Sequence, residues 1–304
     1  MAKIKFETLL KEWWERTLLR GNLDYARHCW RVLEREVLPD IGEYDPKKIT
    51  PPMILTILRR VESEGTFSKA RKIKSHISQA MRYGIACGHV ISDPTRDLGA
   101  ALTKYRHIPR AAITDPREIG YLMKKIEEYK YKQTRICLKF AVLTFMRAGE
   151  ITSAAWEEIE WGRHLWRIPA EKMKMKRAHL VPLATQTVDL LHALQNLTGH
   201  TRWLFPGRKR KDNHIKPGVL TYALRAMGYP KEKVCAHGFR AMAATTLSDM
   251  GWASDVIERQ LAHIDQNRVR AAYQRSELME DRRRMMQAWA DFLDLKCAHA
   301  ILGR

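Results

Sequence analysis

The apolar residues of this chain recur at intervals of three and four, which is the spacing of one face of an α-helix. A stripe of this kind must be buried against another element, so it predicts packed helices. The segment FETLLKEWWERTLL carries such a stripe at Phe6, Leu9, Leu10, Trp13, Trp14 and Leu18. Three further segments, beginning at Tyr25, Pro52 and Ser68, repeat the pattern. Residues 1–100 are therefore predicted to form a helical domain.

The rest of the chain predicts a second domain of mixed composition. Residues 101–113 contain a proline and no sustained periodicity, so we expect a linker there. Within residues 114–304, LWRIPA and AHLVPL alternate like two short strands joined by the basic turn EKMKMKR, and the other segments are helical. The fold class is thus mainly α with a small β-hairpin.

Charge gives the first indication of function. The 304 residues contain 54 Lys and Arg against 34 Asp and Glu, a formal net charge of +20. Such an excess favours a polyanionic partner, because each neutralised phosphate releases counterions. The longest apolar run, CLKFAVLTFM, is too short to span a membrane, and the start of the chain does not resemble a signal peptide. We therefore expect no membrane partner and a location in the cytoplasm or on the nucleoid. The five scattered cysteines indicate neither disulfides nor a zinc site.

The fourth helical segment has one strongly basic face. Its cations, with no acidic residue among them, are Lys69, Arg71, Lys72, Lys74 and Arg82. The face is either solvated or in contact with phosphate, and the missing counter-charges favour phosphate as much as solvent. Ser68 is the expected N-cap of this helix.

The segment KVCAHGFRAMAATTLSDMG places His237 and Arg240 in the first turn of another helix. We expect them to point together out of the core, away from the apolar face at Phe239, Ala243, Leu247 and Met250. Two cations beside the N–H groups of a helix N-terminus are typical of a phosphate site. The alternative is a capping histidine and a surface arginine.

Five further residues are candidates for the same site, although Arg147, His263 and Tyr273 each have an ordinary structural explanation. Arg147 in RAGE could simply pair with the nearby glutamate. Lys174 and Lys176 lie at the tip of the predicted hairpin. His263 could end a helix, and Tyr273 could be a core aromatic.

Taken in order, Arg147, Lys174, His237, Arg240, His263 and Tyr273 resemble the active-site series of the tyrosine recombinases, the phage integrase family. The contexts RAGE, VPL, HGFR, LAH and AAYQR match as well, most like integrases of satellite phages and genomic islands. One difference is Ala262, where many members have glycine. Another is that the sequence starts directly at the core-binding helices, whereas many island integrases have an additional amino-terminal arm-binding domain.

The resemblance implies a helical core-binding domain, a catalytic domain and a mechanism. Tyr273 would attack the scissile phosphodiester to give a 3′-phosphotyrosyl link. Arg147 and Arg240 would clamp the non-bridging oxygens. Lys174, or Lys176 if the register differs, would be the general acid. His237 would assist proton transfer, and His263 would bond the phosphate. No metal or other cofactor is expected.

The implied partners are double-stranded DNA at attachment sites, a homotetramer on two duplexes, and an excision factor or host DNA-bending protein. A tail helix at about residues 282–295 would exchange between protomers, burying its apolar stripe on a neighbour; the alternative is that it folds back on its own domain. Other functions left open are a DNA invertase or resolvase, a type IB topoisomerase and an inactive DNA-binding repressor.

Overall fold

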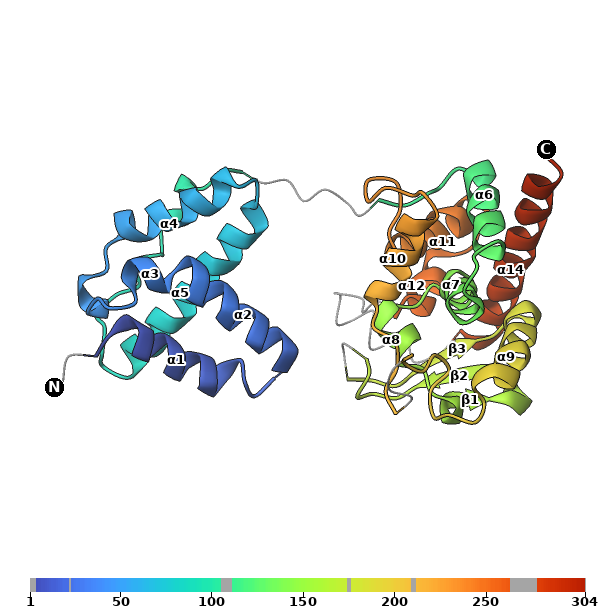
Figure 1. Ribbon diagram of the computed structural model, residues 1–304, viewed down its shortest axis with the longest axis horizontal. Helices are drawn as coiled ribbons and strands as arrows, with labels where there is room; N and C mark the ends of the chain where they lie inside the picture. The colour runs from blue at the N-terminus through green and yellow to red at the C-terminus, as the bar shows by residue number, and fades with distance from the viewer. Residues whose placement is uncertain are drawn as a thin grey trace. The chain divides into compact units, whose positions relative to one another are not determined.

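The computed structural model describes residues 4–21, 23–104, 111–173, 176–208, 212–262 and 278–303. The chain divides into two compact units, Met1–Ile108 and Pro109–Arg304, each with its own hydrophobic core (Figure 1). Helices dominate both units, and the second also contains a small sheet. The predicted fold class, mainly α with a small β element, is confirmed.

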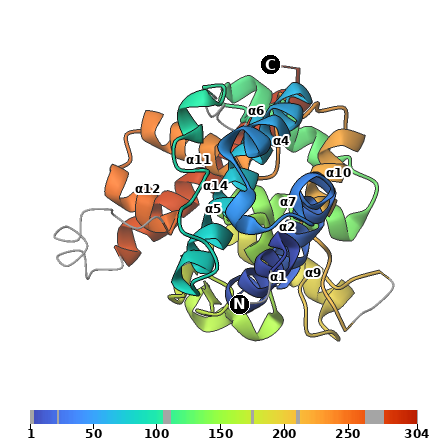
Figure 2. The ribbon, with the colours of Figure 1, turned by 90° about the vertical axis from the view of Figure 1, so that its left-hand side faces the viewer.

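The first unit is entirely helical in its described part. Its α-helices are α1 (Phe6–Thr17), α2 (Leu23–Glu36), α3 (Leu38–Ile41), α4 (Pro51–Ser63) and α5 (Phe67–Ala86). The helix α5 packs on both α1 and α4. Figure 2 shows these helices with the first unit facing the viewer. The apolar stripe of α1 is central to the core, where Phe6, Leu9 and Leu10 are fully buried.

Two details of α5 differ from expectation. Its N-cap is Thr66 instead of Ser68, which lies inside the first turn. Ile73, Ile77 and Met81 are fully buried, whereas Ile85 is 39% exposed. A row of residues spaced by four advances about 40° around the helix at each step. After three steps the row has left the buried face.

The second unit combines helices with a three-stranded sheet. Its α-helices are α6 (Pro116–Glu127), α7 (Lys132–Thr144), α8 (Ala148–Thr152), α9 (Thr185–Thr198), α10 (Gly218–Ala226), α11 (Gly238–Asp249), α12 (Ser254–Gln260) and α14 (Met279–Ile301). The strands β1 (Ile159–Glu160), β2 (Leu165–Ile168) and β3 (His179–Pro182) are antiparallel in the order β1-β2-β3. The predicted pairing of LWRIPA with AHLVPL is confirmed, with Leu165 opposite Pro182. The two-residue strand β1 was not predicted.

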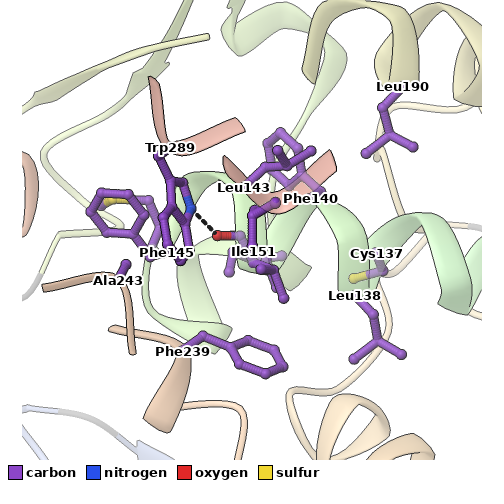
Figure 3. Close-up of a cluster of buried hydrophobic side chains, with 14 of the residues drawn as sticks. Cys137, Leu138, Phe140, Leu143, Phe145, Ile151, Leu190, Phe239, Ala243 and Trp289 are labelled. Carbon is purple, nitrogen blue, oxygen red and sulfur yellow. Dashed lines mark hydrogen bonds between the residues drawn. The ribbon is translucent and has the colours of Figure 1, made fainter. Parts of the chain in front are cut away.

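The tail helix α14 buries its apolar stripe within its own unit. Met285, Met286, Trp289 and Leu293 are at most 1% exposed. Trp289 donates a 3.0 Å hydrogen bond from Nε1 to the carbonyl of Val142 on α7 and meets the ring of Phe145 edge-on (Figure 3). In this structure α6 and α7 of the same chain cover the stripe, which matches the alternative that the helix folds back on its own domain. Exchange of the helix between protomers stays a prediction.

Both described ends of the predicted linker pack into the units. Leu102 is 5% exposed and belongs to the first core, and the backbone N–H of Thr103 donates to Glu62 at 3.1 Å. At the other end, Ile113 is 2% exposed in the second core. The range 101–113 is accordingly wider than the part of the chain that lies between the cores.

Candidate active site

Arg147 is presented by a sharp turn at the end of α7. Phe145, fully buried, adopts the left-handed conformation with φ 40°, which terminates α7 and redirects the chain into α8. Arg147 then donates from its backbone N–H to Glu150 Oε2 and from Nη1 to Glu150 Oε1, both at 2.9 Å. The local arginine–glutamate pair considered from the sequence is present. It holds the guanidinium close to the turn while 26% of the side chain stays exposed.

Arg240 on α11 is buried, contrary to the expectation that it points out of the core. Only 5% of the residue is exposed. Its Nη1 donates to the Phe145 carbonyl at 3.0 Å, and its Nη2 donates to the Leu261 carbonyl at 2.6 Å. These carbonyls follow α7 and α12, where helix ends leave acceptors without intrahelical partners. The guanidinium therefore ties two helix ends together.

The two arginines interact electrostatically. Burial lowers the pKa of Arg240 to about 10, and the positive charge of Arg147 adds to this effect. The residue nevertheless remains protonated at neutral pH. The structure thus brings Arg147 and Arg240 together around the turn at Phe145, as an anion-binding pair requires.

His237 occupies the N-cap position of α11 and is exposed, unlike Arg240 one turn later. The intervening Gly238 is required by packing, since a Cβ there would lie 2.2 Å from the carbonyl oxygen of Ala111. Met250, expected on the apolar face of this helix, is 41% exposed. The predicted phosphate-facing pair is thus split between one exposed and one buried side chain.

The remaining catalytic candidates are described only in part. Lys174, His263 and Tyr273 lie outside the described residues. Lys176 is exposed, has φ 54°, and reaches the Glu171 carbonyl at 3.4 Å. The hairpin is anchored by Lys172, which pairs with Glu158 and donates to the Ser153 carbonyl.

The basic face of α5 has counter-charges that the helix sequence does not show. Lys69 pairs with Glu36 at 3.2 Å and with Glu64 at 2.8 Å. Arg82 lies 3.8 Å from Asp93. The interpretation of this face as free of acidic partners is therefore wrong at both ends.

The central cations of that face differ from one another. Arg71 donates to the Thr103 carbonyl at 2.7 Å. Lys72 and Lys74 form no ion pair within the described residues, and Lys72 is exposed. These two lysines remain the strongest candidates for phosphate contact on α5.

A second basic surface was missed from the sequence. A hollow of about 980 Å³ in the second unit is lined by Tyr129, Tyr131, Lys132, Arg208, Lys216 and Tyr222, among others. The guanidinium of Arg208 lies 4.5 Å from the ring centre of Tyr131, within cation–π range. The alternation of tyrosine and lysine in YKYK, residues 129–132, was the available signal.

The described residues offer neither a metal site nor a membrane-spanning helix. Their His, Cys, Asp and Glu side chains form no group of three or more that could hold a metal ion. None of the helices in the described ranges combines the length and apolar character needed to cross a membrane.

Comparisons with known proteins cover both units. Residues 113–279 match the family model described as the phage integrase family, and residues 6–101 match the phage integrase central domain. The chain is 36% identical over 307 aligned positions to the integrase of Enterobacteria phage P4, covering 95% of this chain and 69% of that protein.

Solved structures show the same fold at low sequence identity. A lambda integrase dimer bound to a COC′ core site matches with a TM-score of 0.71 and 18% identity, covering 87% of this chain and 97% of that one. A lambda integrase tetramer bound to a Holliday junction matches with a TM-score of 0.70 and 17% identity, covering 91% and 78%.

Proposed function

The chain belongs to the phage integrase family and is a site-specific tyrosine recombinase that integrates or excises mobile elements, and from this premise we propose how its residues divide the work. Tyr273 is the nucleophile. Its hydroxyl oxygen attacks the scissile phosphorus, forms a 3′-phosphotyrosyl bond, and releases a 5′-hydroxyl. The 5′-hydroxyl of a partner strand then attacks this bond and restores the tyrosine.

The observation that carries this proposal is the arginine pair around Phe145. Arg240 is fixed by two helix-end carbonyls and Arg147 by Glu150, so both guanidinium groups are held before DNA binds. Planar guanidinium groups match phosphate geometry and stabilise the charge that develops on the phosphorane. In the same proposal Lys174 protonates the leaving 5′-oxygen, with Lys176 as the alternative acid. His237 assists proton transfer and His263 donates a hydrogen bond to the phosphate.

DNA contact is proposed for both units. In the first, Lys72 and Lys74 contact phosphates, with Arg71 beside them, Arg82 at one end of the same surface and Lys69 held mainly by its glutamates. In the second, the tyrosine and arginine side chains of the 980 Å³ hollow add cations and aromatic faces.

Assembly is the other part of the proposal. Four copies of the chain act on two duplexes, by analogy with the lambda integrase tetramer bound to a Holliday junction. An excision factor or a host DNA-bending protein sets the direction of the reaction. The reaction takes place on the bacterial nucleoid. The alternative of a type IB topoisomerase is less favoured because the relatives are integrases.

The decisive experiment asks whether a covalent adduct depends on Tyr273. The probe is a nicked duplex that spans the junction between the element and its host chromosome. After incubation, protein and DNA are separated on a denaturing gel. Tyr273→Phe should bind the duplex with unchanged affinity and form no adduct, because only the nucleophilic oxygen is removed.

The matched control is Tyr121→Phe, which removes the hydroxyl of a tyrosine that is 50% exposed on α6 and does not line the 980 Å³ hollow. It should form adduct at the rate of the unchanged protein. Adduct formation by Tyr273→Phe at a comparable rate would place the nucleophile elsewhere. If the unchanged protein binds the junction but forms no adduct, the result would favour an inactive DNA-binding repressor.

A further inference from the structure

A buried polar network joins three elements of the second unit. Its centre is Arg282 on α14, which is 0% exposed. The guanidinium donates to Gln260 Oε1 from Nε at 3.0 Å and from Nη2 at 2.7 Å. Nη2 also donates to the Leu180 carbonyl on β3. One side chain therefore connects α14 with the last residue of α12 and with β3.

His179 on β3 completes the network. Its Nε2 lies 3.1 Å from the Gln260 carbonyl oxygen, so the Nε2–H tautomer donates a hydrogen bond there. Nη2 of Arg282 is 3.5 Å from the same nitrogen. The residue is 7% exposed, and burial followed by the charge of Arg282 lowers the pKa of His179 to about 3. The ring is thus neutral at physiological pH, which suits it to a place beside a buried guanidinium.

Close packing of these three elements does not by itself require a buried polar network. Burying a guanidinium is costly unless its donors are satisfied, and apolar residues of similar volume often give equal or greater stability. The best-attested advantage of buried polar groups is that they fix one arrangement of the elements they join. Here the elements joined are neighbours of the proposed catalytic residues in the sequence.

The sequence positions make the connection specific. Gln260 lies 13 positions before Tyr273, and Arg282 lies nine positions after it. His179 lies five positions after Lys174. The Leu261 carbonyl, next to Gln260, accepts from Arg240, so the phosphate clamp holds the same helix end. Both ends of the chain segment that carries Tyr273 are therefore tied to one another and to β3.

Building on the proposed role of Tyr273, we propose that Arg282, Gln260 and His179 are positioning residues that fix the two ends of the tyrosine-bearing segment against β3. In this role they would act through the segment that they hold and not on the reacting atoms directly. Their effect is on the probability that the tyrosine oxygen reaches in-line geometry. Small misplacements of a reacting group can reduce a rate by about a hundredfold.

The test is single-turnover adduct formation with the nicked junction duplex at saturating concentration. Arg282→Met keeps most of the side-chain volume and removes every donor. Its adduct rate should fall at least about tenfold, while its Kd for the duplex changes by less than about threefold. The matched control is Arg284→Met on the same helix, where the arginine side chain is 72% exposed and, among the described residues, pairs with Asp281 one turn away. This variant should change neither quantity.

Two more conservative substitutions of Gln260 provide the test if Arg282→Met fails to fold. Gln260→Glu keeps an oxygen for both guanidinium donors and should cleave at close to the unchanged rate. Gln260→Met removes that oxygen and should slow cleavage at a temperature where its circular dichroism and Kd are unchanged. Equal cleavage rates for both variants would overturn the proposal, as would an unimpaired rate for folded Arg282→Met.

A modified substrate separates the tyrosine segment from the lysine hairpin, since β3 leads away from Lys174. A 5′-bridging sulfur in the scissile linkage leaves without protonation by an acid. The defect of Arg282→Met, or of Gln260→Met, should persist on this substrate. If the defect disappears, the network serves the general acid and the proposal is wrong. An adduct that survives Tyr273→Phe would instead refute the assigned nucleophile, whatever the Arg282 variants do.

Discussion

Replacing Arg240 should damage both stability and catalysis, and the structure gives the size of each effect. In Arg240→Ala the carbonyls of Phe145 and Leu261 lose their donor, and both residues are at most 3% exposed. A buried acceptor left unsatisfied costs about 1–3 kcal/mol, so two cost about 2–6 kcal/mol. Loss of one donor to the transition state should also reduce cleavage by about two to three orders of magnitude.

The two effects can be measured separately. Chemical denaturation gives the free energy of unfolding, and single-turnover adduct formation at low temperature gives the rate per folded molecule. Arg240→Lys keeps the charge but offers one nitrogen for two carbonyls, so its stability should lie between those of the alanine variant and the unchanged protein.

A matched control exists in Arg225 on α10. Its guanidinium also joins two backbone carbonyls, those of Tyr229 and Val234, but it is not one of the proposed phosphate ligands. Arg225→Ala should lose stability and keep its cleavage rate per folded molecule. The reasoning is refuted if Arg240→Ala unfolds within about 0.5 kcal/mol of the unchanged protein, the usual range of a surface substitution.

Four shorter predictions follow from other described residues. Ala262→Gly should raise the free energy of unfolding by about 0.5–1 kcal/mol in denaturation, because Ala262 has φ 50° and the left-handed region penalises a Cβ. Lys72→Ala should lower the slope of log K against log salt concentration for duplex binding by about one. Lys69→Ala should change this slope less, because Lys69 is already paired with glutamates. Equal slopes for the two variants would contradict this prediction. Burial, followed by the charges of nearby arginines, lowers the pKa of His179 to about 3 from an unfolded value of 6.5. The stability that the neutral ring contributes is therefore fully present above pH 6.5 and is lost as the pH falls toward 3. Denaturation at pH 7 and pH 5 should show a loss of about 2 kcal/mol for the unchanged protein and no such loss for His179→Gln. EDTA should leave adduct formation on the nicked duplex unchanged, and a strict requirement for magnesium would overturn the side-chain mechanism.

Local periodicity predicted most of the helices because burial of a stripe is decided within each segment. TQTVDLLHALQNLTG became α9, and the alternating LWRIPA and AHLVPL became β2 and β3. The same logic could not identify what covers each stripe. The stripe of α14 is buried as periodicity requires, but its cover is α6 and α7 of the same chain. The spacing of apolar residues predicts that one face of a helix is buried, but it does not identify the element that covers this face.

For the polar site residues too, the sequence did not identify the partners that decide their burial. Arg240 was expected to face outward because arginine is costly to bury alone. It faces inward because the carbonyls after α7 and α12 converge on it, and that convergence depends on elements more than a hundred positions apart. Lys69 gained acidic partners from outside its helix in the same way. Arg282 did leave a signal, since it continues the spacing of Met285 and Met286 onto the buried stripe.

The burial of Arg240 near Arg147 has an electrostatic cost, which neighbouring groups offset. Arg147 and Arg240 repel one another, and burial further disfavours the charged form of Arg240. The protein offsets this cost with Glu150 on one arginine and helix-end carbonyls on the other, since the C-terminal ends of helices carry partial negative charge. These carbonyls are neutral groups, so they orient Arg240 without cancelling its charge. In the proposed mechanism, a phosphodiester that reaches the pair would meet two cations whose positions are already fixed, so the reorganisation that free side chains need would have been completed during folding.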